Sequence, residues 1–245
     1  MNPNLEYPSS VEEALPVVAA VRAVVSGADL VDTLDQIADD LATFSGGLLA
    51  LVYLWSDSRL HLVGQSDLHV PSDAVPKLLA SAEEQFIQSC SSGQISTGWF
   101  PQADHAAARE VAAVPLAFRG QVLGVLGLVA DGGVGSDHLA RMRVYADVAA
   151  VVIASGDPAP DGLARWRTLR VAIEGRIMVD QATGMLIERL GFDARAARER
   201  LRSAASDLGT GLVEVSRQVV DRSINPDVTT LLGSPDKSQS EEPRS

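Results

Sequence analysis

Three arginines, Arg195, Arg198 and Arg202, carry the clearest chemistry in this sequence of 245 residues. They are spaced three and then four residues apart, so on a helix all three side chains point to one side. A guanidinium group donates two parallel hydrogen bonds to phosphate, and it can also stack on an unpaired base. Two interpretations follow: a surface that binds nucleic-acid phosphates, or a solvated helix face balanced by Glu188 and Glu199. Spacing alone slightly favours the second.

The three arginines lie within a segment that predicts three helices. The first helix runs without a proline from Leu163 to Gly191, and Asp193 is placed to cap the second. The second helix carries an apolar stripe opposite the arginines, and a third helix is predicted for residues 212–220. The members of the apolar stripe are Ala197, Leu201, Ala204 and Leu208.

The first of these helices is apolar over a wide arc and carries one polar stripe. A helix with so wide an apolar arc usually packs against other protein on more than one side. Because two short helices alone cannot cover the arc, we expect a homodimer. Arg176, Asp180 and Thr183 form the polar stripe, and Gly184 follows it. Glycine inside a helix costs about 0.5–1 kcal/mol relative to alanine, so we expect another backbone to approach closely there. The residues expected at or near the dimer interface are Trp166, Leu169 and Ile173.

The spacing of these residues resembles the ANTAR domain, a three-helix RNA-binding module of bacterial transcription antitermination regulators. The matching positions are Arg176, Ala182-Thr183-Gly184, Met185-Leu186 and, in the next helix, Leu201-Arg202. Thr183 stands where the family has lysine, and Gly209 where it usually has a polar residue. The resemblance implies binding to paired stem-loops in a nascent transcript, which would keep a terminator hairpin from forming. The RNA-binding residues expected are Arg176, Thr183, Gly184, Arg189, Arg195, Arg198 and Arg202.

A second function, from a different class, is open at this point. Thr183 and Gly209 both remove a side chain that could touch RNA, which favours a dimerisation or interaction protein whose ANTAR-like domain has lost RNA binding. The arginine stripe opposes that interpretation. We expect no enzymatic activity under either hypothesis, because no Ser-His-Asp, Gly-x-Ser-x-Gly or phosphate-binding-loop arrangement occurs.

Charge is unevenly distributed along the chain. The net charge is −12, but residues 161–222 contain 11 arginines and nine acidic residues, a net charge of +2 that leaves −14 for the rest. Only this C-terminal segment could therefore lie comfortably against a phosphate backbone. A single cysteine, no apolar run near the roughly 18 residues that span a bilayer, and no signal-peptide pattern lead us to expect a cytoplasmic protein.

The preceding part of the chain predicts alternating helices and antiparallel strands. Residues 111–130 read as two apolar strands joined by the two-residue turn Arg119-Gly120. The stretch VPLAFRGQVLGVLGLV and the order of elements resemble the GAF domain, a small-molecule-sensing and dimerisation module. Asp29 is placed to cap the first helix, and Ser136 to open the last. The apolar stripe of the first helix is Leu30, Leu34, Ile37, Leu41 and Phe44.

An irregular loop is expected at residues 91–110, where GAF-like domains often close over a ligand. Trp99, Phe100 and His105 lie on it and are candidate ligand-binding residues, although they fit an ordinary loop anchor at least as well. Cys90 falls on an apolar helix face and is expected to be a packed thiol. The four histidines have no partners at metal-ligand spacing, so we expect no metal and no cofactor.

The predicted fold class is α+β, with a GAF-like antiparallel sheet and flanking helices followed by a small three-helix bundle. The predicted boundaries are an N-terminal helical extension at 1–28, a GAF-like domain at 29–156, a linker at 157–161, an ANTAR-like domain at 162–222 and a polar, disordered tail at 223–245.

Overall fold

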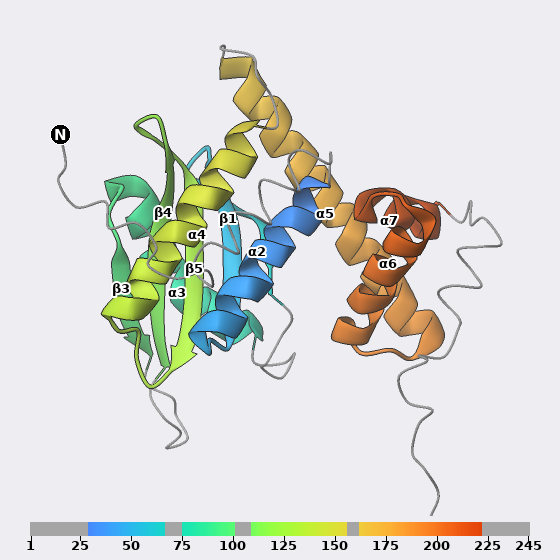
Figure 1. Cartoon of the computed structure of the whole chain (residues 1–245), viewed down its shortest axis with the longest axis horizontal. Coiled ribbons are helices and arrows are strands. Elements are labelled where there is room, and N and C mark those ends of the chain that lie inside the picture. The colour runs from blue at the N-terminus through green and yellow to red at the C-terminus, as the bar shows by residue number, and fades with distance from the viewer. Residues whose placement is uncertain (1–28, 67–74, 101–108, 156–161, 222–245) are drawn as a thin grey trace, which may run out of the picture. The chain divides into compact units, whose positions relative to one another are not determined.

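The computed structural model describes residues 29–66, 75–100, 109–155 and 162–221, and Figure 1 shows its elements in chain order. The chain divides into two compact units, Met1–Arg176 and Ile177–Ser245. We call the described residues of each the N-terminal unit and the C-terminal unit. The predicted extension at 1–28, the linker at 157–161 and the tail at 223–245 lie outside the described residues.

The N-terminal unit is built on a five-stranded antiparallel sheet with the strand order β2-β1-β5-β4-β3. This arrangement confirms the predicted α+β class. The elements are α2 (Leu30–Ser45), β1 (Leu49–Ser56), β2 (Arg59–Gln65), α3 (Val75–Ser92), β3 (Ser96–Phe100), β4 (Arg109–Phe118), β5 (Gln121–Asp131) and α4 (Ser136–Ser155).

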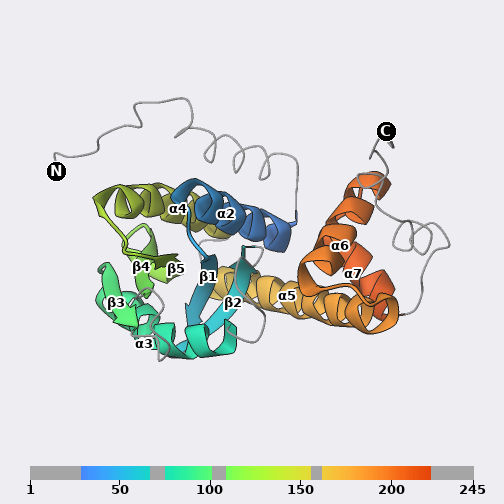
Figure 2. The same cartoon turned by 90° about the horizontal axis from the view of Figure 1, so that it is seen from below.

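Helices cover both faces of this sheet, as the view in Figure 2 shows, with α2 and α4 on one side and α3 on the other. Alternate residues of the central strands pack in opposite directions, so Val52 and Leu128 join the core under α2 and α4, whereas Leu51 and Val129 join the core under α3. Burial on both faces explains why β4 and β5 are almost continuously apolar in sequence.

The core beneath α3 contains a pair of aromatic rings. Phe86 of α3 lies with its ring centroid 5.3 Å from that of Tyr53. A Cβ added at Gly127 would lie 2.5 Å from the Phe86 ring, so β5 needs a glycine at this position. The same core contains the buried Cys90, which confirms the prediction of a packed thiol.

Local sequence signals account for the start of α2 and for the turn between β4 and β5. The Asp29 carboxylate caps α2 by accepting the Val31 N–H at 2.9 Å. Arg119 and Gly120, with φ of 49° and 78°, form the predicted two-residue turn between β4 and β5. Phe44 differs from its prediction: it is 46% exposed, because it lies in the last turn of α2. Residues 96–100 also differ, because they form the edge strand β3 by pairing with β4, within what the sequence predicted as an irregular loop.

Three helices form the C-terminal part of the chain: α5 (Gly162–Leu190), α6 (Ala194–Leu208) and α7 (Leu212–Val220). The division between the two units falls inside α5, after Arg176. Asp193 caps α6 as predicted, accepting the Ala196 N–H at 2.7 Å. The apolar positions of the three helices form the core of the C-terminal unit, namely Val179, Ala182, Leu186, Ala197, Leu201, Ala204, Leu212, Val215 and Val219.

Candidate nucleic-acid interface

Arg176, which the sequence placed on an RNA-binding face, lies instead in the interior of the N-terminal unit. Its Nη1 donates to Asp35 Oδ1 of α2 at 2.8 Å, and the two side chains are 4% and 1% exposed. The Asp35 carboxylate also accepts the backbone N–H of Gln65 at 2.8 Å. In this arrangement the Arg176 guanidinium neutralises a buried carboxylate and does not face solvent.

Thr183 and Gly184 are neighbours in α5 but occupy opposite environments. Thr183 is buried, and its hydroxyl donates to the carbonyl oxygen of Val179 at 2.7 Å. A helical threonine can satisfy its hydroxyl in this way, so it needs no solvent or RNA. Gly184 is exposed, and an added Cβ would meet no atom within 4 Å. The close backbone approach expected at Gly184 is therefore not made by the described part of this chain.

The arginine stripe of α6 is only partly presented to solvent. Arg195, in the first turn, is exposed, whereas Arg202 is half-buried and the side chain of Arg198 is mostly buried. Arg198 Nη2 donates to Asp180 Oδ1 of α5 at 3.2 Å. The predicted spacing on one helix is confirmed, but Arg198 ties α6 to α5 and has less freedom to reach a phosphate group.

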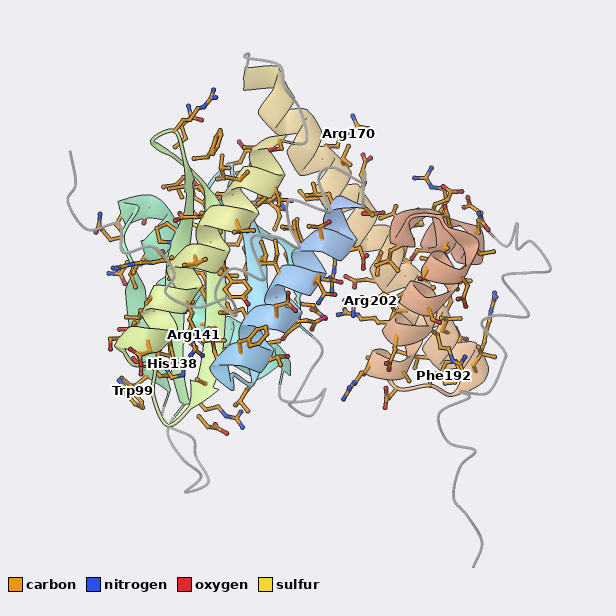
Figure 3. All side chains as sticks on the ribbon, in the orientation of Figure 1. Trp99, His138, Arg141, Arg170, Phe192 and Arg202 are labelled. Atoms are coloured by element: carbon orange, nitrogen blue, oxygen red, sulfur yellow. The ribbon has the colours of Figure 1, made fainter. Side chains whose placement is uncertain are left out.

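The turn between α5 and α6 gathers residues that sequence reasoning only partly identified. Arg189, in the last turn of α5, was predicted and is exposed. Phe192 and Arg200 were missed: the Arg200 guanidinium carbon lies 5.8 Å from the centroid of the Phe192 ring. Figure 3 labels Phe192 at this turn. The sequence signal that could have identified Phe192 is its position as an aromatic residue directly after Gly191, the glycine that ends α5.

The three candidate ligand-binding residues are described by the structure to different extents. Trp99 lies on β3 and is 56% exposed, with its ring 3.3 Å from where a Cβ of Gly133 would be. The backbone of Phe100 belongs to the same strand, and nothing is described of its side chain. His105 lies outside the described residues. Of the three side chains, the structure therefore describes that of Trp99 alone.

Titratable groups of the N-terminal unit show the effect of burial. Desolvation raises the pKa of the Cys90 thiol to about 12, so this thiol is protonated at neutral pH. Burial likewise raises the pKa of Tyr53 to about 12.

Within residues 29–66, 75–100, 109–155 and 162–221, no group of three or more His, Cys, Asp or Glu side chains is placed to hold a metal ion. None of the helices in these ranges is long and apolar enough to cross a membrane.

Residues 167–220 match the family model of the ANTAR domain. This match confirms the predicted resemblance over α5, α6 and α7, which are the helices that hold the arginines described above. No curated protein matches the chain.

The N-terminal unit is similar to solved GAF domains. The GAF domain of an Acinetobacter phosphoenolpyruvate-protein phosphotransferase is 18% identical, with a TM-score of 0.45, and the match covers 59% of this chain and 94% of that one. The corresponding domain from Coxiella burnetii is 15% identical, with a TM-score of 0.45 and coverage of 60% and 95%. The second GAF domain of DevS from Mycobacterium smegmatis is 22% identical, with a TM-score of 0.37 and coverage of 50% and 91%. The chain thus has a GAF-like fold followed by an ANTAR domain, in the predicted order.

Proposed function

We propose that this chain, which carries an ANTAR domain at residues 167–220 behind a GAF-like fold, binds RNA stem-loops in nascent transcripts and so prevents transcription termination. The family match supports this proposal most directly. The protein performs no covalent chemistry in this scheme. By binding one RNA structure in preference to a competing terminator hairpin, it shifts the population between the two.

The charge distribution supports contact through the C-terminal segment. Residues 161–222 carry a net charge of +2, whereas the rest of the chain carries −14 and repels a polyanion. Arg189 and Arg195 are exposed in the C-terminal unit, and each can donate two hydrogen bonds to a phosphate group. Unpaired bases of a loop offer flat faces on which an arginine or aromatic side chain stacks, and such bases are the usual targets in sequence-specific RNA recognition.

Two measurements test this function. The full chain should enrich RNA stem-loops from a pool of transcripts of its source genome, and the enriched sequences should lie beside or within terminators. Transcription in vitro through such a terminator should then give more full-length product when the protein is added. Failure to enrich any stem-loop over a linear RNA of equal length would overturn the proposal.

We also propose that the chain is a homodimer in solution. Two valines of the N-terminal unit, Val151 on α4 and Val171 on α5, are 49% and 61% exposed, and burying their side chains against a second copy would stabilise a dimer. Of the residues expected near the interface, Ile173 packs partly against the core of its own unit, and nothing is described of the side chains of Trp166 and Leu169. Light scattering at micromolar concentration should report twice the chain mass, and a strict monomer would contradict the proposal.

A dimerisation or interaction protein without RNA binding is the second candidate. The burial of Arg176 and Thr183 favours it, because two positions of the ANTAR pattern contribute to packing in this structure. The capture experiment discriminates between the two functions. A chain that dimerises but enriches no RNA supports the second candidate.

A further inference from the structure

We propose that Phe192 and Arg200 form a platform on which an unpaired base of the bound RNA stacks. The inference rests on the proposed function and deepens it, because it names the part of the RNA that the turn between α5 and α6 recognises. Both residues belong to the C-terminal unit, so the platform is complete within that unit.

The platform consists of two flat groups held one over the other. The Arg200 guanidinium carbon lies 5.8 Å from the centroid of the Phe192 ring, within the range of a cation–π interaction. Both side chains are half-buried, so each is anchored by the protein and still reaches solvent. A nucleobase stacks readily on such a surface, because every base has a flat π-face.

The way in which α5 ends explains why residue 192 is apolar. It does not explain why this residue is aromatic or why Arg200 lies over its ring. Gly191 has φ of 71°, and its N–H donates to the Ile187 carbonyl oxygen at 3.0 Å, a left-handed helix end. An apolar residue after such a glycine often packs back on the last turn. That role would be served equally by leucine. It requires neither an aromatic ring nor an arginine placed over it.

The surroundings of the platform favour RNA as its occupant. Arg189 and Arg195 lie three residues before and three residues after Phe192, and both are exposed. They can contact the phosphates on either side of a stacked base. Exposed apolar side chains also occur at the end of α5, where Ile187 is 38% and Leu190 is 44% exposed.

The local charge balance indicates that stacking must carry much of this contact. Glu188 and Glu199 lie in the same stretch as the arginines and are exposed, so attraction to phosphate is partly offset there. A duplex backbone would find little net positive charge at this turn. Stacking on the flat surface stabilises the binding of an unpaired base regardless of the local charge. The platform therefore favours the unpaired bases of a loop over a double-stranded stem.

The test uses the full chain and a library of RNA stem-loops with a constant stem and a randomised loop, with the blunt stem duplex as reference. The wild-type chain should prefer stem-loops to the duplex. Phe192→Leu keeps an apolar residue after Gly191 but removes the ring, and it should weaken binding by about 5- to 100-fold. Phe192→Trp should retain binding. Arg217→Ala, which removes an exposed arginine from α7, should leave the affinity unchanged and is the matched control.

A second variant and a spectroscopic signal separate stacking from folding. Arg200→Lys keeps the charge but removes the flat group, and it should also weaken binding, while the melting temperature stays at the wild-type value. 2-Aminopurine at a selected loop position should lose fluorescence on binding wild type and retain it with Phe192→Leu. If wild type binds stem-loops and both variants bind equally well, the platform is wrong while the proposed function survives. If wild type binds no stem-loop, both are overturned together.

Discussion

Arg176 Nη1 lies 2.8 Å from Asp35 Oδ1, and the two residues are separated by 141 positions in the sequence. Both side chains are almost completely buried, and Asp35 also accepts the N–H of Gln65 at the end of β2. One carboxylate thereby joins α2, β2 and α5 within the N-terminal unit. The arginine of the ANTAR pattern thus fixes the part of α5 that belongs to this unit.

Breaking this ion pair should strongly destabilise the N-terminal unit. Arg176→Met leaves the Asp35 carboxylate buried without the charge that neutralises it, and we expect a loss of about 3–5 kcal/mol in the free energy of unfolding. Replacing both residues by apolar ones of similar size should cost less than the single change, because no buried charge remains. Urea denaturation followed by circular dichroism measures all three proteins.

The exposed pair Arg170 and Glu174, on the same helix, provides the control. Their side chains are 78% and 60% exposed, with Arg170 Nε 2.6 Å from Glu174 Oε1. Arg170→Met should leave the urea midpoint unchanged, because an exposed pair of this kind contributes little. An Arg176→Met protein as stable as the Arg170→Met protein would show that the buried pair does not form in solution.

Thr183→Lys should destabilise the C-terminal unit. The family carries lysine at this position, and on the sequence alone the charge would be expected to strengthen RNA binding. The Thr183 side chain is buried, however, so lysine must either carry its ammonium group into the core or displace the packing around it. A melting temperature lower than that of wild type is expected. An unchanged melting temperature together with tighter RNA binding would show that the side chain reaches solvent.

Gly184→Ala should raise stability and test the RNA role of this glycine at the same time. An alanine Cβ would meet nothing within 4 Å, and alanine is favoured over glycine inside a helix by about 0.5–1 kcal/mol. If RNA approaches the backbone at Gly184, the same substitution should weaken RNA affinity. Stability and affinity, measured by urea denaturation and by fluorescence anisotropy with an RNA stem-loop, should then move in opposite directions.

The features that the sequence predicted correctly depend on a few adjacent residues. Asp29 and Asp193 cap helices because a carboxylate placed before an apolar period accepts a first-turn N–H. Arg119-Gly120 forms its turn because two positive φ angles match the twist of the flanking strands. Caps and turns of this kind form between residues adjacent in sequence, so they can be predicted without knowledge of tertiary contacts.

The candidate site was harder to predict because it depends on contacts distant in the sequence. The spacing of Arg176, Asp180 and Thr183 correctly indicates one side of a helix, but it cannot tell whether solvent or protein covers that side. A carboxylate 141 residues away decides the burial of Arg176, and a hydrogen bond to its own helix permits the burial of Thr183. The Phe192–Arg200 pair depends on how α6 packs beside the turn, which periodicity does not show.

Stability should fall at alkaline pH partly because of Cys90. Burial raises its pKa from 9.0 to about 12, so the folded state holds this proton more tightly than the unfolded state. The resulting stabilisation is fully present below pH 9 and is lost as the pH rises from 9 through about 12. Cys90→Ala should be less stable at pH 8 because of the cavity but should lose less stability between pH 8 and pH 11. Equal losses would show that the thiol does not contribute.

Arg189 and Arg195 should account for a measurable part of the salt dependence of RNA binding. Each exposed arginine that contacts a phosphate of a single-stranded segment contributes about −0.7 to the slope of log K against log salt concentration. The Arg189→Ala/Arg195→Ala protein should therefore bind more weakly at low salt, with a slope less steep by about 1.4. Arg198→Ala should change the slope less, because Arg198 is bound to Asp180 and its side chain is 11% exposed. The slopes come from fluorescence anisotropy with one RNA stem-loop across a salt series, with Arg217→Ala as the exposed control. If the double variant keeps the wild-type slope while Arg198→Ala flattens it, RNA contacts α6 at Arg198 and not at the turn between α5 and α6.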